Sequence, residues 1–275
     1  GSHTVVELLN NNFEVVIIDD LSNTEKFILK NIEEITGKKP IFYPFDLKRK
    51  ELLKQVFDAH KIEGCIHFAA YKAVGESQEK PIDYYENNLF SLINLLQEMK
   101  ERNISNFIFS SSCTVYGQAD TMPIDENTPL KLPESSYGKT KQMGEEILKD
   151  FATAHQKKVT LLRYFNPIGA HPSAKLGELP IGIPNNLVPY VMQTAAGVRE
   201  KLSVWGNDYP TEDGTAIRDY IYVVDLAKAH VKALQKLISE NSETLVDIYN
   251  LGTGKGSSVL EVVHAFEKAN DVAVP

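Results

Sequence analysis

The sequence predicts an α/β fold: a doubly wound, Rossmann-like parallel sheet with a smaller mixed α/β substrate-binding domain. Three observations lead to this prediction. Short apolar runs alternate with helical patterns up to residue 164. Polar side chains follow several of these runs, where strands of such a sheet end and ligands bind. The stretch 169–186 is then rich in glycine, proline and asparagine, which indicates a second domain built largely from loops.

The alternating part of the chain supplies the elements of the sheet in order. Residues 4–9 continue as a helix, and the apolar run that follows them predicts the first strand. All the predicted strands are short apolar runs bounded by turn residues: 13–19, which is this first strand, then 41–45, 64–68, 106–110 and 159–164. The predicted helices are 28–35, 47–60, 81–102 and 136–155.

The helix predicted at 81–102 begins well, because Pro81 suits a first helical turn. It carries an apolar stripe at helical spacing, which fits either the core or a contact between subunits: Tyr85, Leu89, Leu92, Leu96 and Met99.

Domain boundaries follow from the change in composition. We expect residues 1–166 to form a dinucleotide-binding domain and residues 167–275 to form the substrate-binding domain. Segments near 215–250 are expected to return to the first domain. Helical patterns reappear at 224–240 and 257–270.

Composition and charge exclude several classes of protein. The net charge of −8 and pI of about 5.5 argue against nucleic acid or an anionic membrane as partner. Two cysteines, Cys65 and Cys113, do not form a disulfide framework, and the apolar runs are too short to span a bilayer. The seven histidines lack metal-ligand spacing, so we expect no metal. These features predict a cytoplasmic protein.

The sequence Tyr137-x-x-x-Lys141 at a predicted helix start is the main catalytic candidate. Ser135 or Ser136 would cap this helix, and four residues place the ammonium one turn from the phenol. A free tyrosine has a pKa of about 10, and a cation about 4 Å away stabilises the phenolate by about 4 kcal/mol. We therefore expect Lys141 to lower the pKa of Tyr137 and make it a base. Such pairs also occur by chance on helix surfaces.

Three other features are candidates with ordinary alternatives. Asp19 lies at the end of the strand predicted at 13–19, where an acid binds an adenosine ribose and favours NAD over NADP, but it also suits a turn. The hydroxyl run 110–112 could face Tyr137 across a cleft, or be a polar loop. Arg218 could hold a diphosphate, or be a solvated surface charge. Cys113 more plausibly packs under its loop than acts as a nucleophile, and His67 fits a core position.

Together these segments resemble the extended short-chain dehydrogenase/reductases, and within them the UDP-hexose 4-epimerases. The likeness runs along nearly the whole chain, and its last three motifs are the most specific. The matching stretches are 1–4, 67–77, 110–117, 137–141, 162–167, 182–187, 206–215 and 218–221.

The resemblance implies a role for each matching residue. Tyr137 is the expected base, Lys141 its activator and a ligand of the nicotinamide ribose, and Ser112 a hydrogen-bond partner of the sugar 4-hydroxyl beside Thr114. The implied NAD site consists of Gly1, Asp19, Asp20, Asn23, Asp46, Leu47, Phe68, Ala69, Lys72, Asn87 and Phe165 together with Tyr137 and Lys141. The implied UDP-sugar site consists of Ser112, Asn166, Asn186, Leu187 and Arg218.

The implied reaction interconverts UDP-galactose and UDP-glucose. C4 gives a hydride to bound NAD, the 4-keto sugar turns over in the site, and the hydride returns to its opposite face. No acid follows Thr114, unlike in relatives that dehydrate sugars. Another UDP-sugar, an N-acetylhexosamine or a uronate, is an alternative substrate, and a non-catalytic NAD-binding relative is an alternative from another class.

The resemblance also bears on the ends of the chain and on assembly. Gly1 matches the last glycine of a phosphate-binding loop, so we expect an earlier strand in the parent protein, and Pro275 precedes a further part of the substrate domain. We accordingly expect this stretch to bind NAD poorly. Family members form homodimers through the helices starting near Pro81 and Ser136, which implies the same here.

Overall fold

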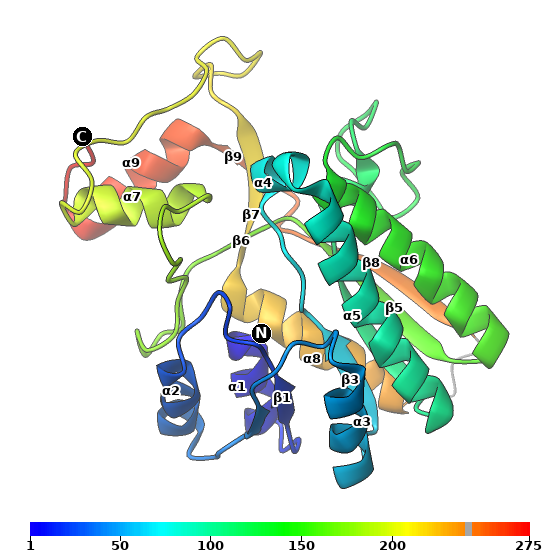
Figure 1. The fold of residues 1–275 in the computed structure, drawn as a ribbon. Coiled ribbons are helices and arrows are strands. Elements are labelled where there is room, and N and C mark those ends of the chain that lie inside the picture. The colour runs from blue at the N-terminus through cyan, green and yellow to red at the C-terminus, as the bar shows by residue number, and fades with distance from the viewer. Residues whose placement is uncertain (240–243) are drawn as a thin grey trace.

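A computed structural model describes residues 1–239 and 244–275, and it has the predicted α/β architecture (Figure 1). Its centre is a parallel sheet in the order β3-β4-β5-β8. These strands are Gly64–His67, Asn106–Ser112, Lys158–Tyr164 and Val246–Leu251. Because the strands are parallel, their carboxyl ends share one edge, and β8 brings residues 246–251 into the same sheet as the first part of the chain.

Strands β1 (Val16–Ile18) and β2 (Ile41–Tyr43) form a separate parallel pair. In the described residues no ladder joins β1 to β3. The helices that precede and follow β1 are α1 (Ser2–Asn10) and α2 (Phe27–Thr36), which pack on each other around Val6, Leu9 and Ile32. Burying these side chains holds the strand pair in place beside the main sheet.

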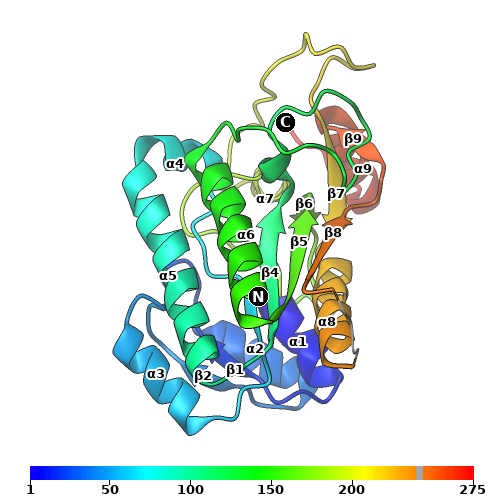
Figure 2. The same ribbon diagram turned by 90° about the vertical axis from the view of Figure 1, so that its right-hand side faces the viewer.

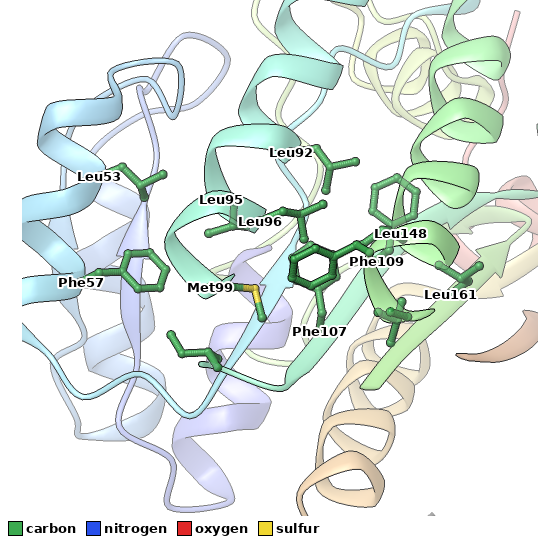
Figure 3. Close-up of a cluster of buried hydrophobic side chains, with 14 residues drawn as sticks. Leu53, Phe57, Leu92, Leu95, Leu96, Met99, Phe107, Phe109, Leu148 and Leu161 are labelled. Carbon is green, nitrogen blue, oxygen red and sulfur yellow. The ribbon is translucent and has the colours of Figure 1, made fainter. Parts of the chain in front are cut away.

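Helices cover both faces of the main sheet, as a doubly wound fold requires. Helices α5 (Pro81–Glu101) and α6 (Ser136–His155) pack side by side on one face, and α8 (Val223–Ser239) lies on the other with α1 beside it (Figure 2). Helix α3 (Lys50–Ala59) packs against α5. Figure 3 shows the resulting core between α3, α5, α6 and the strands, with Leu92, Phe109 and Leu148 at its centre.

The smaller unit lies beyond the carboxyl edge of the sheet (Figure 1). Strand β6 (Asn166–Ile168) pairs with β7 (Ile217–Tyr222), which pairs antiparallel with β9 (Gly256–Ser258). Helices α7 (Leu187–Ala195) and α9 (Val259–Asn270) pack together there. The loop after β6 reaches back across the molecule, where Leu176 is buried against α1 and α2.

Several predicted boundaries need correction. The first strand covers Val16–Ile18 rather than 13–19, because only these residues pair with β2, and α3 begins at Lys50 rather than at residue 47. Strand β4 runs to Ser112, because its pairing with β5 continues to Tyr164. Residue 240, predicted to end α8, lies outside the described residues. The sequence prediction missed β6–β9, α4 (Val74–Glu79), α7 and the 3-10 helix η1 (Cys113–Tyr116).

Within residues 1–239 and 244–275, no helix combines the length and the apolar character needed to cross a bilayer.

Candidate active site

Tyr137 and Lys141 lie on the first two turns of α6 and point into the protein, with 7% and 4% of their surfaces exposed. Ser135 is the N-cap, and its Oγ accepts a hydrogen bond from the backbone N–H of Gly138 at 3.1 Å. This confirms one of the two predicted caps. The cap fixes where the helix begins, and therefore which way the Tyr137 ring faces.

Strand β4 holds the ammonium of Lys141 above the ring of Tyr137. Its Nζ donates to the carbonyl oxygen of Ser110 at 2.7 Å and lies 5.0 Å from the Phe109 ring centroid and 5.9 Å from the Tyr137 ring centroid. Burial lowers the pKa of Lys141 to about 8, although the charge of Glu145 opposes that shift. The ammonium therefore loses its proton more readily than an exposed lysine does.

The expectation of a lowered pKa for Tyr137 is wrong for this structure, because the net shift has the opposite sign. The pKa of Tyr137 is raised above its ordinary value, first because the phenol is buried and second because of the neighbouring Tyr164 phenol. A hydrogen bond with the Ser112 side chain acts in the opposite direction, but by less. Desolvation of the phenolate therefore outweighs the hydrogen bond from Ser112.

The Ser112 side chain hydrogen-bonds the Tyr137 hydroxyl, which agrees with the first of the two interpretations of the hydroxyl run. Ser112 is the last residue of β4, and its Oγ accepts a hydrogen bond from the Thr114 backbone N–H at 3.3 Å. The Oγ1 atom of Thr114 is buried and has no hydrogen-bond partner among the described residues. An orphaned hydroxyl beside Ser112 and Tyr137 suits a ligand hydroxyl, because a buried polar atom without a partner is costly.

Gly138, the residue after Tyr137, allows a test of how closely the start of α6 packs on Pro133 and Thr114. A Cβ at residue 138 would lie 2.7 Å from the Cβ of Pro133 and 3.5 Å from that of Thr114. We expect Gly138→Ala to lower the free energy of unfolding by about 1–3 kcal/mol through overpacking and to lower kcat by displacing Tyr137. Denaturant titration and steady-state kinetics measure the two effects.

Gly75→Ala is the matched control for Gly138→Ala. Gly75 also lies in a helix, but a Cβ there meets nothing within 4 Å, so alanine should be neutral or stabilise by up to about 1 kcal/mol. Equal stability of the Gly138→Ala protein and its parent would contradict the close approach to Pro133.

Two residues predicted for the cofactor, Asp19 and Lys72, lie near Gly1 at the N-terminus of α1. Gly1 is the N-cap of this helix, and the charges of Asp19 and Lys72 both act on its backbone nitrogen. Asp19 and Asp46 follow β1 and β2, and each accepts a hydrogen bond from a backbone N–H two residues on, at Leu21 and Lys48. Asp19 therefore also makes the side-chain hydrogen bond of a turn, which was the alternative interpretation from the sequence.

The remaining cofactor candidates occupy different surroundings. The Phe68 ring lies 4.7 Å from that of His230, and Asn87 donates to Asn88, which bonds Thr140 of α6. Phe165 follows β5, and Ala69 is exposed after β3. Leu47 is partly buried against the core, whereas Asp20 and Asn23 are exposed in the turn after β1.

Apart from Ser112, the residues predicted to bind the substrate lie on β6, β7 and the start of α7, in the smaller unit. Asn166 begins β6 and donates to the Asp219 carbonyl at 3.3 Å, and Asn186 caps α7, whose first residue is Leu187. Asn186 donates to Glu178 at 2.6 Å, and Lys72 lies 3.6 Å from the same carboxylate. Glu178 thus contacts both a substrate candidate and a cofactor candidate.

Arg218 is exposed on β7, with its Nη1 bonded to the Ile217 carbonyl at 2.7 Å. Its charge acts on Cys113, so the guanidinium lies toward the Ser112 loop. Burial raises the pKa of the Cys113 thiol to about 11, which agrees with the interpretation that this cysteine packs under the loop and is not a nucleophile.

Sequence reasoning missed three buried residues around the Tyr137–Lys141 pair. Glu145 and Arg163 form an ion pair behind α6, and His230 on α8 lies 2.9 Å from Ser110 Oγ through its Nε2. The signal for Glu145 was available, because 137, 141 and 145 repeat at four-residue spacing on one helix face. His67 is buried as expected and stacks on Phe109.

The N-terminus of α1 fits the diphosphate of a dinucleotide. A Cβ built on Gly1 would meet nothing within 4 Å, and no side chain caps the helix, so the first-turn N–H groups lack partners in the helix. Asp19 beside this end suits a ribose. Fold and site together define an NAD-dependent enzyme with a buried tyrosine and lysine at the carboxyl edge of a parallel sheet.

Comparison with known proteins agrees with this class. The model of the NAD dependent epimerase/dehydratase family matches residues 1–252, and the chain belongs to this family. It is 54% identical over its whole length to UDP-glucose 4-epimerase of Bacillus subtilis, covering 80% of that protein, and 50% identical to that of Drosophila melanogaster, covering 79%. The crystal structure of UDP-glucose 4-epimerase from Bifidobacterium longum with NAD+ and UDP superposes with a TM-score of 0.94 at 48% identity, covering the whole chain and 81% of that protein.

Proposed function

We propose that this chain is a UDP-glucose 4-epimerase, which interconverts UDP-galactose and UDP-glucose with NAD as cofactor. The observation that carries the proposal is the buried Tyr137–Lys141 pair facing Ser112 at the carboxyl edge of the sheet, in a chain 54% identical to such an enzyme. When bound, NAD supplies a hydride acceptor for C4 of the sugar and a positive charge beside the phenol.

The side chains of this cleft handle the proton and the sugar. Tyr137 takes the proton of the 4-hydroxyl and later returns it to the same oxygen. Ser112 holds that oxygen by a hydrogen bond, and the buried Thr114 hydroxyl, which has no partner among the described residues, lies two residues further on. Lys141, fixed by Ser110, keeps a positive charge over the ring and stabilises the phenolate while the proton is away.

The binding roles of the other residues are part of the same proposal. Asp19 and the N-terminus of α1 bind the cofactor ribose and diphosphate. Arg218 and Asn186 hold the diphosphate of the UDP-sugar, which stays bound while the sugar ring turns over between the two hydride transfers. Binding energy far from C4 thereby keeps the intermediate in the cleft. The other proposed cofactor residues are Asp20, Asn23, Asp46, Leu47, Phe68, Ala69, Lys72, Asn87 and Phe165, and the other substrate residues are Asn166 and Leu187.

The direct test is to supply UDP-galactose and a large excess of NAD to the purified protein, because this stretch is expected to bind the cofactor poorly, and to follow the anomeric protons by NMR. The proposal predicts conversion to UDP-glucose until the two sugars reach equilibrium, with no net change in NAD. Release of a 4-keto-6-deoxy sugar, or conversion of UDP-N-acetylgalactosamine but not of UDP-galactose, would assign a different reaction or substrate.

We also propose a homodimer formed through the outer faces of α5 and α6. Phe90 and Met143 are 54% and 45% exposed there. An open hollow of about 580 Å³ lies on this face, lined by Leu89, Leu130, Gln142, Met143, Glu146, Ile147 and Asp150. Two antiparallel copies of such a helix pair would bury these apolar side chains.

Met143→Glu should disrupt this dimer, because two buried carboxylates near the twofold axis would be desolvated without partners. Sedimentation velocity should show a dimer for the parent and a shift toward monomer for the variant. Val198→Asp, a substitution at an apolar residue that is 72% exposed in the smaller unit, is the control and should leave the dimer intact. A parent protein that sediments as a monomer at micromolar concentration would contradict the proposal.

A further inference from the structure

A buried ion pair lies one helical turn beyond Lys141. Glu145 and Arg163 have 0% and 2% of their surfaces exposed. Arg163 donates from Nε to Oε1 of Glu145 at 2.9 Å and from Nη2 to Oε2 at 2.6 Å. Ser111 Oγ donates to the same Oε1 at 2.5 Å. A bidentate pair with a third donor fixes the orientation of all three side chains.

This ion pair connects the elements that carry the catalytic candidates. Glu145 shares one face of α6 with Tyr137 and Lys141, because the three residues repeat at four-residue spacing. Ser111 precedes Ser112 on β4 and pairs in register with Arg163 on β5.

The ion pair also reaches η1, the 3-10 helix that carries Thr114. Arg163 Nη1 donates to the hydroxyl of Tyr116, the last residue of η1, at 3.0 Å. That hydroxyl donates to Asn250 Oδ1 on β8 at 2.7 Å. A shift of α6 against β4 would therefore break several buried hydrogen bonds at once.

Glu145 also supplies negative charge close to Lys141. Tyr137 and Glu145 share the helix face of Lys141, and His67 on β3 is close enough for the charge of Lys141 to act on it. Arg163 and Tyr164 on β5 and Tyr116 on η1 are the titratable groups that contact Glu145, Tyr137 and Arg163 in turn. Burial lowers the pKa of His67 to about 3, and burial raises the pKa values of the three tyrosines, so these four groups are neutral near pH 7. The carboxylate of Glu145 is thus the charge that favours the protonated form of Lys141.

On the basis of the proposed epimerase function, we propose that Glu145 is a positioning residue for the reaction. Its hydrogen bonds to Arg163 and Ser111 hold Tyr137 in register with Ser112, and its charge keeps the Lys141 ammonium protonated above the Tyr137 ring. It touches neither the sugar nor the cofactor and acts through these neighbours.

Glu145→Gln and Glu145→Asp separate the charge from the hydrogen-bond geometry. Glutamine keeps the length of the side chain and removes its charge, so the pKa of Lys141 and the alkaline limb of the kcat–pH profile should move to lower pH by about one unit or more. Aspartate keeps the charge but is too short for the bidentate contact. Its alkaline limb should therefore stay near that of the parent, although its melting temperature falls.

The pKa of Lys141 can be measured without turnover. Protein labelled with [ε-13C]lysine is titrated by NMR, and the Lys141 signal is assigned by its loss in Lys141→Arg. If Glu145→Gln fails to fold, the double variant Glu145→Gln/Arg163→Met removes both charges together, which buried pairs often tolerate. The Lys141 signal should still titrate at lower pH than in the parent.

Two results would overturn the inference. The first is a Lys141 titration that is the same in Glu145→Gln, or in the double variant, as in the parent. The second is loss of activity in Glu145→Gln and Glu145→Asp in proportion to their melting temperatures with no shift of the pH profile, as a merely structural role requires. The parent protein could also prove inactive while the Lys141 signal still titrates at lower pH in Glu145→Gln than in the parent. That result would count against the proposed function and would support the electrostatic role of Glu145.

Discussion

Replacing Tyr137 with phenylalanine should lower kcat for UDP-galactose by about 10²–10⁴-fold, the usual contribution of a general acid–base group. The phenol is the group that exchanges a proton with the 4-hydroxyl, and it is buried beside Ser112 where water has little access. The KM should change much less than kcat, because phenylalanine keeps the ring that lines the cleft. Steady-state kinetics by NMR or a coupled assay measure both constants.

Tyr249→Phe is the matched control for this loss. The Tyr249 hydroxyl accepts a hydrogen bond from Lys236 Nζ at 2.6 Å, so it is also a tyrosine held by a lysine, but on β8 and α8 away from the Ser112 loop. Its removal should lower the free energy of unfolding by about 1 kcal/mol and leave kcat within about twofold. If Tyr137→Phe turned over as fast as Tyr249→Phe, another group would have to be the base.

Replacing Lys141 with methionine should lower kcat by about 10²–10³-fold, because the buried phenolate loses the cation above its ring. The same substitution should stabilise the fold at neutral pH. Burial lowers the pKa of Lys141 from 10.5 to about 8, and a difference of this size corresponds to about 3 kcal/mol of unfavourable desolvation. The lost hydrogen bond to Ser110 offsets about 1 kcal/mol of that gain.

The pH dependence of the free energy of unfolding shows whether the gain in stability comes from removing the buried ammonium. The folded-state pKa lies below the unfolded value, so below about pH 8 both states bind the proton and the penalty is fully present. Between about pH 8 and 10.5 the unfolded state binds more protons, and the stability of the parent therefore rises with pH. The stability difference between Lys141→Met and the parent should shrink over this range in denaturant titrations, whereas a constant difference would contradict a buried, strained ammonium.

Periodicity predicted the first half of the fold because its helices and strands bury apolar faces of regular spacing. The helix at 136–155 was predicted at its observed bounds, since a serine cap precedes a long amphipathic pattern. The smaller unit could not be predicted in the same way. Strand β6 has three residues and contains Pro167, and β9 is Gly256–Ser258, so both depend on pairing partners distant in the sequence.

The catalytic site was predicted in its residues but not in its electrostatics. Spacing alone places Lys141 beside Tyr137, and the structure brings both to Ser112. Spacing does not show how deeply the phenol is buried, and burial raises its pKa. Nor does it show Arg163, which is supplied by β5 and pairs with Glu145 only after the sheet has formed.

The central claim is that one carbon is oxidised and then reduced within a single cleft. UDP-galactose carrying deuterium at C4 tests it most directly, with the product analysed by NMR and mass spectrometry in ordinary water. The account predicts UDP-glucose that retains the deuterium at C4, because the hydrogen leaves and returns as hydride without meeting solvent. UDP-glucose with protium at C4 would show exchange with water and would contradict the account.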